Sequence, residues 1–309
     1  MSHGIVVPTR KQAPQNIARK GIVQARRGNL LPLLLLGSLR VSRPTASVGS
    51  TPRFAYATFL IGPTNETSFA GVNSLGHHGS RDQYLNRTIC FQQRIRQLEA
   101  KYPLVVLHDY EMDLSIYFDR TFKVEPSLVR KADLQQLHLN KVLIWKLVEF
   151  ERVVCMDSDI YLRRLPDPLF TLPLSAPIAA TPGCIHGDQW FAGGFLVLTP
   201  SEMVAAQMLH ALDTPRILAT YPRHTCTGPF FDDQRFLNGF FKGNYTKLDR
   251  RWNFATHYSG RPIGVDPDVN IHFTGRNKPA WHNCQHGTYD LKTSPKALLI
   301  AHKALNTST

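Results

Sequence analysis

An apolar run that ends in two acidic residues constrains the fold of this chain more than any other feature. The run is Val153-Val154-Cys155-Met156, and Asp157-Ser158-Asp159 follows it directly. Such a run is typical of a strand buried on both faces, as in a parallel sheet covered by helices. The acids fit an ordinary turn, because Asp and Ser favour turns. They also fit a ligand site, because open α/β sheets bind ligands at this edge and paired carboxylates suit a divalent cation.

Strand-like and helix-like segments alternate through the first half of the chain. Strands are predicted over 54–61 and 104–107, where apolar residues run together. Helices are predicted over 82–100 and 134–150, and a loop rich in Gly, Ser and Asn is predicted over 62–80. This order predicts an α/β domain with a mainly parallel central sheet flanked by helices.

The second half of the chain adds a few further elements. A strand is predicted over 195–198, and the spacing from Thr199 to Glu202 is that of a capping box that opens a helix. Another helix is predicted to begin near Asp232, and the alternating residues over 269–273 predict a half-buried strand. We expect a single domain over 53–285, between a disordered leader or targeting segment over 1–52 and a polar tail over 286–309.

The formal net charge of +13 comes mainly from the start of the chain. Residues 1–53 carry nine Lys and Arg and no acid, so the remainder carries +4. No nucleic-acid-binding motif accompanies this charge, and we expect no nucleic-acid partner. The apolar stretch over 30–36 is far shorter than the roughly 20 residues that span a bilayer. The segment fits a disordered basic leader, a signal sequence or an organellar transit peptide, and it could associate weakly with membranes.

Cysteines and glycosylation sequons bear on the compartment. The cysteines contain no C-x-x-C pair, so we expect no zinc site. Cys155 should be a buried thiol, and Cys184, Cys226 and Cys284 could include one disulfide pair, which the sequence does not assign. N-x-[ST] sequons occur at Asn65, Asn86, Asn244 and Asn306. With the apolar stretch, the sequons favour the secretory pathway or Golgi lumen, and the cytoplasm and an organelle remain the alternatives.

Lys141 is out of place on the predicted helix over 134–150. Leu137, Ile144 and Val148 share its helical face and are apolar. A lysine there either extends along its stem to solvent or places its ammonium in a pocket against an anion. Because the helix leads directly into the strand that ends at Asp157, we prefer the pocket interpretation.

Two further polar clusters accompany these residues. Asp233 and Gln234 stand where a helix is predicted to begin, and acids there also fit ordinary helix-terminus chemistry. His272, Gly275 and Lys278 lie close together in the sequence. An imidazole, a backbone amide and an ammonium could surround a metal diphosphate, although a histidine on a polar strand face is more often simply exposed.

Taken in order, these segments resemble the motifs of glycosyltransferase family 8, the group that contains glycogenin and galactinol synthase. Lys141-Val142-Leu143-Ile144-Trp145 before Asp157-Ser158-Asp159 resembles its T-K-x-x-x-W and D-x-D motifs. Phe191-Ala192-Gly193-Gly194 resembles F-N-[SA]-G, Asp233-Gln234-Arg235-Phe236-Leu237-Asn238 resembles D-Q-x-x-L-N, and 272–279 resembles H-F-x-G-x-x-K-P. The resemblance covers about residues 54–282.

The resemblance implies a GT-A fold with a Rossmann-like nucleotide-binding half and an acceptor half. It further implies a UDP-sugar donor, Mn²⁺ (or Mg²⁺) and transfer with retention of configuration to an unknown saccharide, polyol or protein. The implied metal ligands are Asp157, Asp159 and His272. The implied catalytic residues are Lys141, Asp233 and Gln234, and the implied donor-binding residues are Thr58, Leu60, Tyr84, Ser158, Gly193, Gly275 and Lys278.

The chain departs from the family pattern at several positions. Ala192 replaces the Asn of F-N-[SA]-G, which removes an amide expected to bind the donor or acceptor sugar. This change raises the alternative of a catalytically weakened homologue that binds a sugar or a partner. A metal-dependent nucleotidyl or phosphoryl transferase would also use paired acids, but the absence of a Gly-rich phosphate loop argues against it.

Overall fold

The computed structural model describes residues 53–61, 81–124, 138–184, 187–213, 232–255 and 268–274. All of them belong to one compact unit, Val41–Thr309. The leader predicted over 1–52, the loop over 62–80 and the tail over 286–309 lie outside the described residues. So do Gly275, Lys278 and the sequons at Asn65 and Asn306.

Within the described residues, seven strands form one sheet in the order β3-β2-β1-β4-β7-β6-β8. β1 lies parallel to β2 and β4, and β2 lies parallel to β3, whereas β7 is antiparallel to both β4 and β6. The predicted parallel sheet is therefore confirmed for β1 to β4. The strands are β1 (Phe54–Leu60), β2 (Leu104–His108), β3 (Arg120–Lys123), β4 (Arg152–Met156), β6 (Ile178–Cys184), β7 (Gly187–Leu198) and β8 (Thr246–Lys247).

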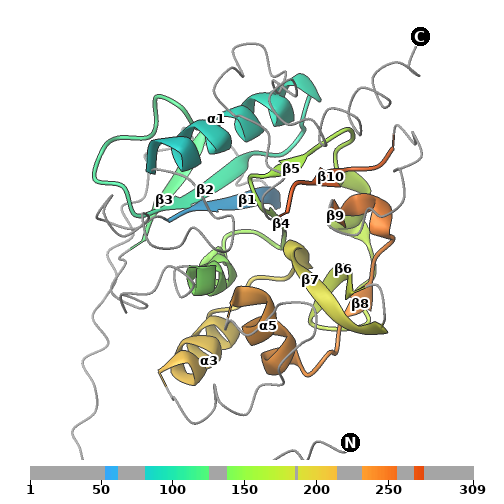
Figure 1. Ribbon diagram of the computed structural model, residues 1–309. Helices are drawn as coiled ribbons and strands as arrows, with labels where there is room; N and C mark the ends of the chain where they lie inside the picture. Colours follow the sequence, from blue (N-terminus) through green and yellow to red (C-terminus); the bar gives the residue numbers. More distant parts are fainter. Residues whose placement is uncertain are drawn as a thin grey trace, which may run out of the picture. The chain divides into compact units, whose positions relative to one another are not determined.

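Helices cover both faces of the sheet, with α1 on one face and α3 and α5 on the other (Figure 1). Alternation along β1 sends Ala55 and Ala57 to the core on the α3 and α5 side, and Tyr56 and Leu60 to the core that contains Phe91 of α1. The helices are α1 (Arg81–Gln97), α3 (Glu202–Leu212) and α5 (Asp233–Phe241), with shorter 3₁₀ helices η4 (His138–Lys146), η5 (Asp167–Thr171) and η6 (Arg250–Trp252).

A second, three-stranded sheet carries part of the polar region. Its order is β5 (Ile160–Tyr161), β10 (Ile271–His272) and β9 (Phe254–Ala255). His272 pairs with Ile160 of β5, so the turn after β4 and the far end of the chain are brought together. The strand predicted over 269–273 is shorter than expected. Its Asn270 and His272 are buried rather than exposed: the Asn270 side chain accepts hydrogen bonds from the Arg163 and Arg164 N–H groups, and His272 lies against Asp159.

The helix predicted over 134–150 is wrong in type and extent. The structure has a 3₁₀ helix, η4, and Val148 lies beyond its end with 48% of its surface exposed. Residues 139–145 are all buried, so packing on every side decides their conformation more than an amphipathic α-helical pattern does. With three residues per turn, Lys141 shares its face with Ile144. The prediction that Lys141 points inward is nevertheless correct, because only 1% of it is exposed.

The start of α3 also differs from the predicted capping box. Ser201, not Thr199, is the N-cap, and its hydroxyl accepts a hydrogen bond from the Val204 N–H at 3.3 Å. The Ser201 N–H donates to the Trp145 carbonyl at 2.9 Å, which ties α3 to η4. In contrast, α5 begins as predicted, with Asp232 as its N-cap.

β7 is longer than the strand predicted over 195–198 and is irregular in its middle. Leu196 pairs with Ala180 and Phe191 pairs with Pro182, so four residues of β7 lie opposite one residue of β6. Such bulges bend a strand and redirect its residues, often beside active sites. The bulged segment contains Gly193 and Gly194, which both contact the polar region described next.

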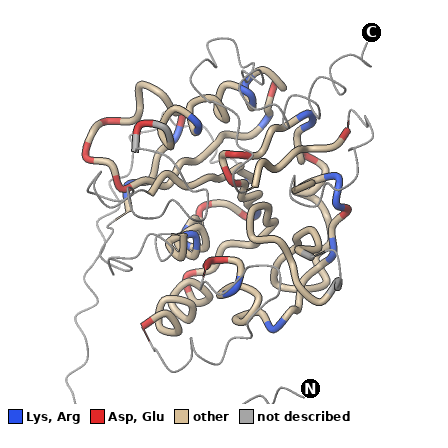
Figure 2. Tube along the Cα trace, in the orientation of Figure 1, with Lys and Arg blue, Asp and Glu red and all other residues tan. Residues whose placement is uncertain are grey.

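Charges of both signs are interspersed along the described trace (Figure 2). Among the residues that the structure describes, no helix has both the length and the apolar character needed to cross a membrane.

Candidate active site

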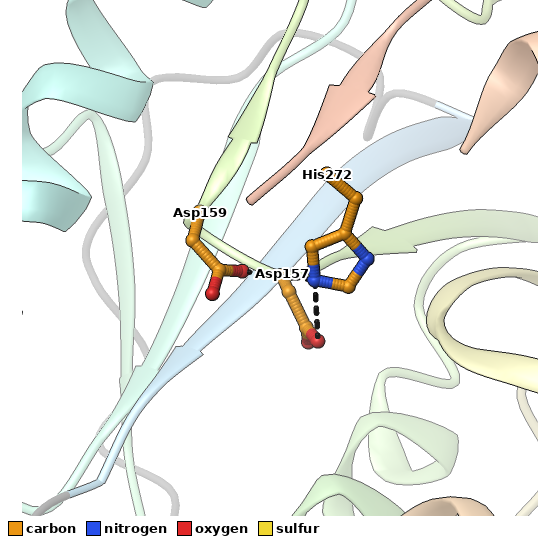
Figure 3. Close-up of side chains that lie close together, drawn as sticks. All are labelled: Asp157, Asp159 and His272. Atoms are coloured by element: carbon orange, nitrogen blue, oxygen red, sulfur yellow. Dashed lines mark ion pairs between the residues drawn. The ribbon is translucent and has the colours of Figure 1, made fainter. Parts of the chain in front are cut away.

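Two aspartates and a histidine form a compact ligand cluster at the carboxyl end of β4. Asp157 and Asp159 flank the turn between β4 and β5, and His272 comes from β10 (Figure 3). The His272 Nε2 lies 3.2 Å from an Asp159 oxygen and 3.9 Å from an Asp157 oxygen. One ligand atom from each residue can be chosen so that all three lie within 4.8 Å of one another. The three predicted metal ligands are therefore brought together as one set.

Gly194 allows the cluster to close. A Cβ at this position would collide with the His272 ring and would lie 2.9 Å from the Asp157 Oδ2. The Asp157 N–H also donates to the Gly194 carbonyl at 2.8 Å, so the β7 backbone fixes the start of the acidic turn. Any larger residue at 194 would displace two of the three ligands.

The Lys141 ammonium lies behind this cluster and is surrounded by acceptors. It pairs with Asp157 at 2.9 Å and with Asp233, and it donates to the Gly193 carbonyl at 2.9 Å. The Phe59 ring lies 5.1 Å from the ammonium on another side. The buried ammonium therefore meets two carboxylates and one backbone carbonyl. Lys141 thus connects η4, the turn after β4, β7 and α5.

Asp233 and Gln234 stand in the first turn of α5 against the β7 bulge. The Gln234 Oε1 accepts a hydrogen bond from the Gly193 N–H at 3.0 Å. A Cβ on Gly193 would lie 3.2 Å from Gln234 atoms and 3.3 Å from an Asp233 oxygen, so this approach also requires a small residue. The two adjacent glycines therefore contact different partners: Gly193 lies against α5, and Gly194 lies against the Asp157 and His272 side chains.

Asn238 fastens α5 to β7 one helical turn further on. Its side chain accepts from the Phe191 N–H and donates to the Phe191 carbonyl, both at 2.9 Å. It also donates to the Gln234 carbonyl at 2.7 Å, and it is fully buried. The position of Gln234 therefore depends on Asn238.

Burial and the Lys141 charge set the pKa values in the centre of the site. Burial lowers the pKa of Lys141, but attraction to Asp157 and Asp233 outweighs it, and the net pKa is raised. At Asp157, burial raises the pKa and Lys141 opposes the rise only in part. Burial also acts upward at Asp233, but Lys141 and then His138 bring its pKa below the ordinary value. We infer a protonated Lys141 beside an ionised Asp233.

Asp232 has a different environment from its neighbour. Burial and then the Asp233 charge raise the pKa of Asp232 to about 7. One of its oxygens accepts a hydrogen bond from the Arg235 N–H at 2.8 Å, which makes Asp232 the N-cap of α5.

The predicted donor-binding residues that the structure describes differ in their burial and in their contacts. Thr58 is fully buried on β1, and its hydroxyl has no hydrogen-bond partner among the described residues. Leu60 ends β1 with its side chain in the core beside α1, so only its backbone remains for a ligand. Ser158 is half-buried in the acidic turn. Tyr84 is half-buried on α1, with the Arg87 guanidinium 4.8 Å from its ring centre. Their roles stay predictions.

The structure adds residues that sequence reasoning did not single out. Gly194 and Asn238 occur within quoted motifs without a role of their own, and Phe59 lies on the first strand beside Lys141. Two successive glycines inside a strand run are a known signal for a bulge or a close backbone approach. That signal could have identified Gly194, whereas the contacts of Asn238 and Phe59 depend on tertiary packing.

The cysteines with described side chains take two forms. Cys90, which was left out of the expected pair, is disulfide-bonded. Cys155 is a free buried thiol, as predicted. The side chains of Cys184, Cys226 and Cys284 lie outside the described residues.

Comparison with known proteins gives consistent matches in sequence. A family model described as Glycosyl transferase family 8 matches residues 85–285. Glycogenin of Neurospora crassa is 31% identical over 234 residues, which cover 72% of this chain and 31% of glycogenin. Galactinol synthase 1 of Solanum lycopersicum is 23% identical over 266 residues, covering 74% of this chain and 79% of that protein.

Solved structures match at the level of the fold. Galactosyltransferase LgtC, in complex with donor and acceptor sugar analogues, matches with a TM-score of 0.52 at 14% identity, covering 82% of this chain and 96% of that one. Glycosyltransferase GlyE of Streptococcus pneumoniae TIGR4 has a TM-score of 0.51 at 15% identity, covering 80% and 62%. The likeness supports the predicted GT-A fold. The chain spans only about a third of the first relatives in sequence, 31% of glycogenin and 28% of UDP-glucuronate:xylan alpha-glucuronosyltransferase 2 of Arabidopsis thaliana.

Proposed function

Because this chain belongs to glycosyltransferase family 8, we propose that it transfers a hexosyl or related group from a UDP-sugar to a saccharide, polyol or protein acceptor. We further propose that transfer retains the anomeric configuration and requires Mn²⁺ or Mg²⁺. The observation that carries the proposal is the convergence of the Asp157, Asp159 and His272 cluster with Asp233 through the single ammonium of Lys141.

The ligand cluster fits a divalent cation on its own chemistry. Asp157 and Asp159 supply carboxylate oxygens, which suit Mg²⁺ and Mn²⁺, and His272 adds a nitrogen, which favours Mn²⁺ over Mg²⁺. Gly194 leaves the space in which these three side chains meet. A bound cation would supply Lewis-acid stabilisation of the departing diphosphate.

The chain's own residues would orient the groups and balance their charges. Lys141 holds Asp157 and Asp233 at fixed positions and keeps two nearby carboxylates compatible with each other. When the bond between the sugar and UDP breaks, positive charge develops on the sugar carbon, and an ionised Asp233 would stabilise it. Asp233 is also the candidate nucleophile if a covalent intermediate forms. Gln234, held by Gly193, would position the sugar beside it.

A screen of UDP-sugars for Mn²⁺-dependent UDP release tests the proposal. We expect release with at least one donor, and a fall of more than about 100-fold when Asp157→Asn removes a metal ligand. Asp249→Asn, which changes an exposed aspartate at the start of η6, serves as the matched control and should leave release unchanged. Metal-independent release, or equal calorimetric binding of UDP with Mn²⁺ to the unaltered protein and to Asp157→Asn, would contradict the proposal.

Ala192 keeps one alternative open for the same screen. Its small, buried side chain stands immediately before the two glycines of the site, where the family pattern has an amide. A homologue that binds sugars without transferring them would bind UDP-sugars but release no UDP. Release of pyrophosphate instead of UDP would indicate nucleotidyl transfer.

A further inference from the structure

We propose that Asn244 is an N-glycosylation site and that this chain accordingly folds in the oxidising lumen of the secretory pathway. The inference is independent of the proposed transfer reaction. It rests on the exposed position of one sequon, on the hydrogen bonds of that sequon's threonine, and on a disulfide-bonded cysteine elsewhere in the fold.

Asn244 stands in an exposed turn directly after α5. Lys242 ends the helix in the left-handed conformation with φ 52°, and Gly243 follows with φ 69°. The Asn244 N–H then donates to the Phe241 carbonyl at 2.8 Å, which closes the turn. The Asn244 side chain is exposed, so a glycan on its amide nitrogen would extend into solvent.

Thr246 completes the sequon, and its contacts in the fold indicate that the sugar is added before folding. In the fold its hydroxyl accepts hydrogen bonds from the Ser175 N–H at 2.9 Å and the Ala176 N–H at 3.2 Å. A transferase that reads the Asn-x-Thr sequence needs this hydroxyl and an extended backbone. The sugar must therefore be added before β8 pairs with β6, that is, on the translocating chain.

The glycan would not obstruct the proposed active site. Asp233 begins α5, and Asn244 follows its last residue, Phe241. A helix of nine residues is about 13 Å long at 1.5 Å per residue, and the two positions lie at its opposite ends. Glycosylation and sugar transfer are thus compatible in one molecule.

A second observation points to the same compartment. Cys90 is disulfide-bonded although Cys155, equally buried, is a free thiol. Structural disulfides persist in the secretory pathway and are rare in the cytosol, where thiols are kept reduced. A sequon is read only in the secretory pathway, so the two features imply one location.

The modification is a balanced group transfer. The Asn244 amide nitrogen attacks C1 of an oligosaccharide linked to a lipid diphosphate. The new N–C1 bond forms as the C1–O bond to the diphosphate breaks, the amide loses one proton, and the lipid diphosphate leaves. The co-substrate is therefore a lipid-diphosphate-linked oligosaccharide, which the membrane of the producing cell supplies.

Asn86 is a weaker case among the described sequons. It is also exposed, but it lies inside α1, where Thr88 donates its hydroxyl hydrogen to the Tyr84 carbonyl at 2.9 Å. Of these two, Asn244 alone occupies a surface turn, which is the setting expected of a glycosylated sequon. Asn86 is therefore the natural comparison site.

The test expresses the full chain in cells that carry out N-linked glycosylation and maps its peptides by mass spectrometry after enzymatic removal of N-glycans. We expect the Asn244 peptide to show conversion to Asp. Asn244→Gln should migrate faster on a gel than the unaltered protein, by the mass of one glycan. Thr246→Ser keeps both the sequon and the hydroxyl, so it should migrate like the unaltered protein.

Two outcomes overturn the proposal: an unmodified Asn244 peptide from the folded protein, or a Cys90 that reacts with thiol reagents before reduction. UDP release by Asn244→Gln should equal that of the unaltered protein, because Asn244 belongs to no part of the proposed active site. Failure of glycosylation with intact UDP release would therefore refute this inference without affecting the proposed function.

Discussion

Gly194 shows how a single missing side chain can determine the geometry of the proposed metal site. Its Cα faces both His272 and Asp157, and the space for a methyl group there is already filled. Gly193, its neighbour, faces Asp233 and Gln234 at 3.2 to 3.3 Å instead. Replacing either glycine by alanine adds one methyl group, but the methyl group meets different side chains at the two positions.

We predict that Gly194→Ala weakens Mn²⁺ binding by about 10- to 100-fold, in the range seen when residues that orient metal ligands are changed. The added methyl group forces His272 and Asp157 apart. Gly193→Ala is the matched control, and it should leave Mn²⁺ affinity within about 2-fold while lowering turnover through Gln234. Isothermal titration with MnCl₂ measures the first effect, and equal affinities for the two variants would contradict the assignment.

Lys141 is the second residue on which the site depends. Nearly all of its side chain is buried, and two carboxylates depend on its charge. Removing one partner of a buried ion pair leaves an uncompensated charge, which costs about 3 kcal/mol. We therefore predict that Lys141→Met lowers the free energy of unfolding by roughly that amount in urea titrations of metal-free protein.

A double variant separates this electrostatic effect from lost packing. Lys141→Met combined with Asp233→Asn removes both members of one pair, so its cost should be clearly less than the sum of the two single changes. Strict additivity would mean that the ion pair between Lys141 and Asp233 does not contribute to stability.

At the level of elements, the first strands and helices were predictable, whereas β3, β6, β8 and β9 and the contacts between elements were not. Apolar runs identified β1, β2 and β4, because a strand buried on both faces shows a continuous run of apolar residues in the sequence itself. The η4 segment was misassigned because its burial on every side removes the amphipathic pattern on which a helix assignment depends. The three metal ligands were predicted from motif order, but the bulge in β7 was not, since it depends on pairing with β6.

The junction between α5 and β7 is the element-scale feature that holds Asp233 and Gln234, the proposed catalytic residues. Asn238 makes its three hydrogen bonds to the Phe191 backbone and the Gln234 carbonyl inside the core. Each such hydrogen bond contributes about 1 kcal/mol to stability, and leaving the buried Phe191 and Gln234 backbone groups without a partner lowers stability further. We predict that Asn238→Ala lowers the free energy of unfolding by roughly 3 kcal/mol.

The same variant should also lower turnover, because Gln234 loses the contact that fixes its position. Asn253→Ala provides a comparison, since this buried asparagine donates one hydrogen bond, to Thr181 at 3.3 Å. A smaller loss of stability with unchanged turnover is expected for it. If Asn238→Ala left turnover intact, the junction would be a stability feature only.

For the whole molecule, the site is a meeting point of five separate segments. The turn after β4, β10, the bulge of β7, η4 and the start of α5 each supply one or two groups, and the sheet order places them side by side. Concentrating carboxylates in this way affects the stability of the entire fold. Asp232 gives the clearest case, because its pKa is raised to about 7 while it stays outside the ligand cluster.

The sign of this effect follows from proton binding. The unfolded chain releases the Asp232 proton near pH 4, but the native protein keeps it until about pH 7. Between these values the native state binds more protons, so the Asp232 contribution to stability is complete below pH 4. It is lost as pH rises to about 7. Asp232→Asn keeps an N-cap oxygen and has no charge to bury. In metal-free buffer we predict equal stability of the variant at pH 4 and a gain on the order of 2 kcal/mol at pH 8.

Asp113 provides a control of opposite sign. The Ser115 N–H donates to its carboxylate and lowers the pKa of Asp113 below the ordinary value. Asp113 therefore stabilises the fold above the pKa of the unfolded chain and loses this effect as pH falls, so Asp113→Asn should cost stability at neutral pH and not in acid. Urea titrations from pH 4 to pH 8 measure the free energy of unfolding of each variant relative to the unaltered protein. With rising pH this difference should increase for Asp232→Asn and decrease for Asp113→Asn. Parallel curves would show that Asp232, the half-buried N-cap of α5, does not hold its proton up to about pH 7.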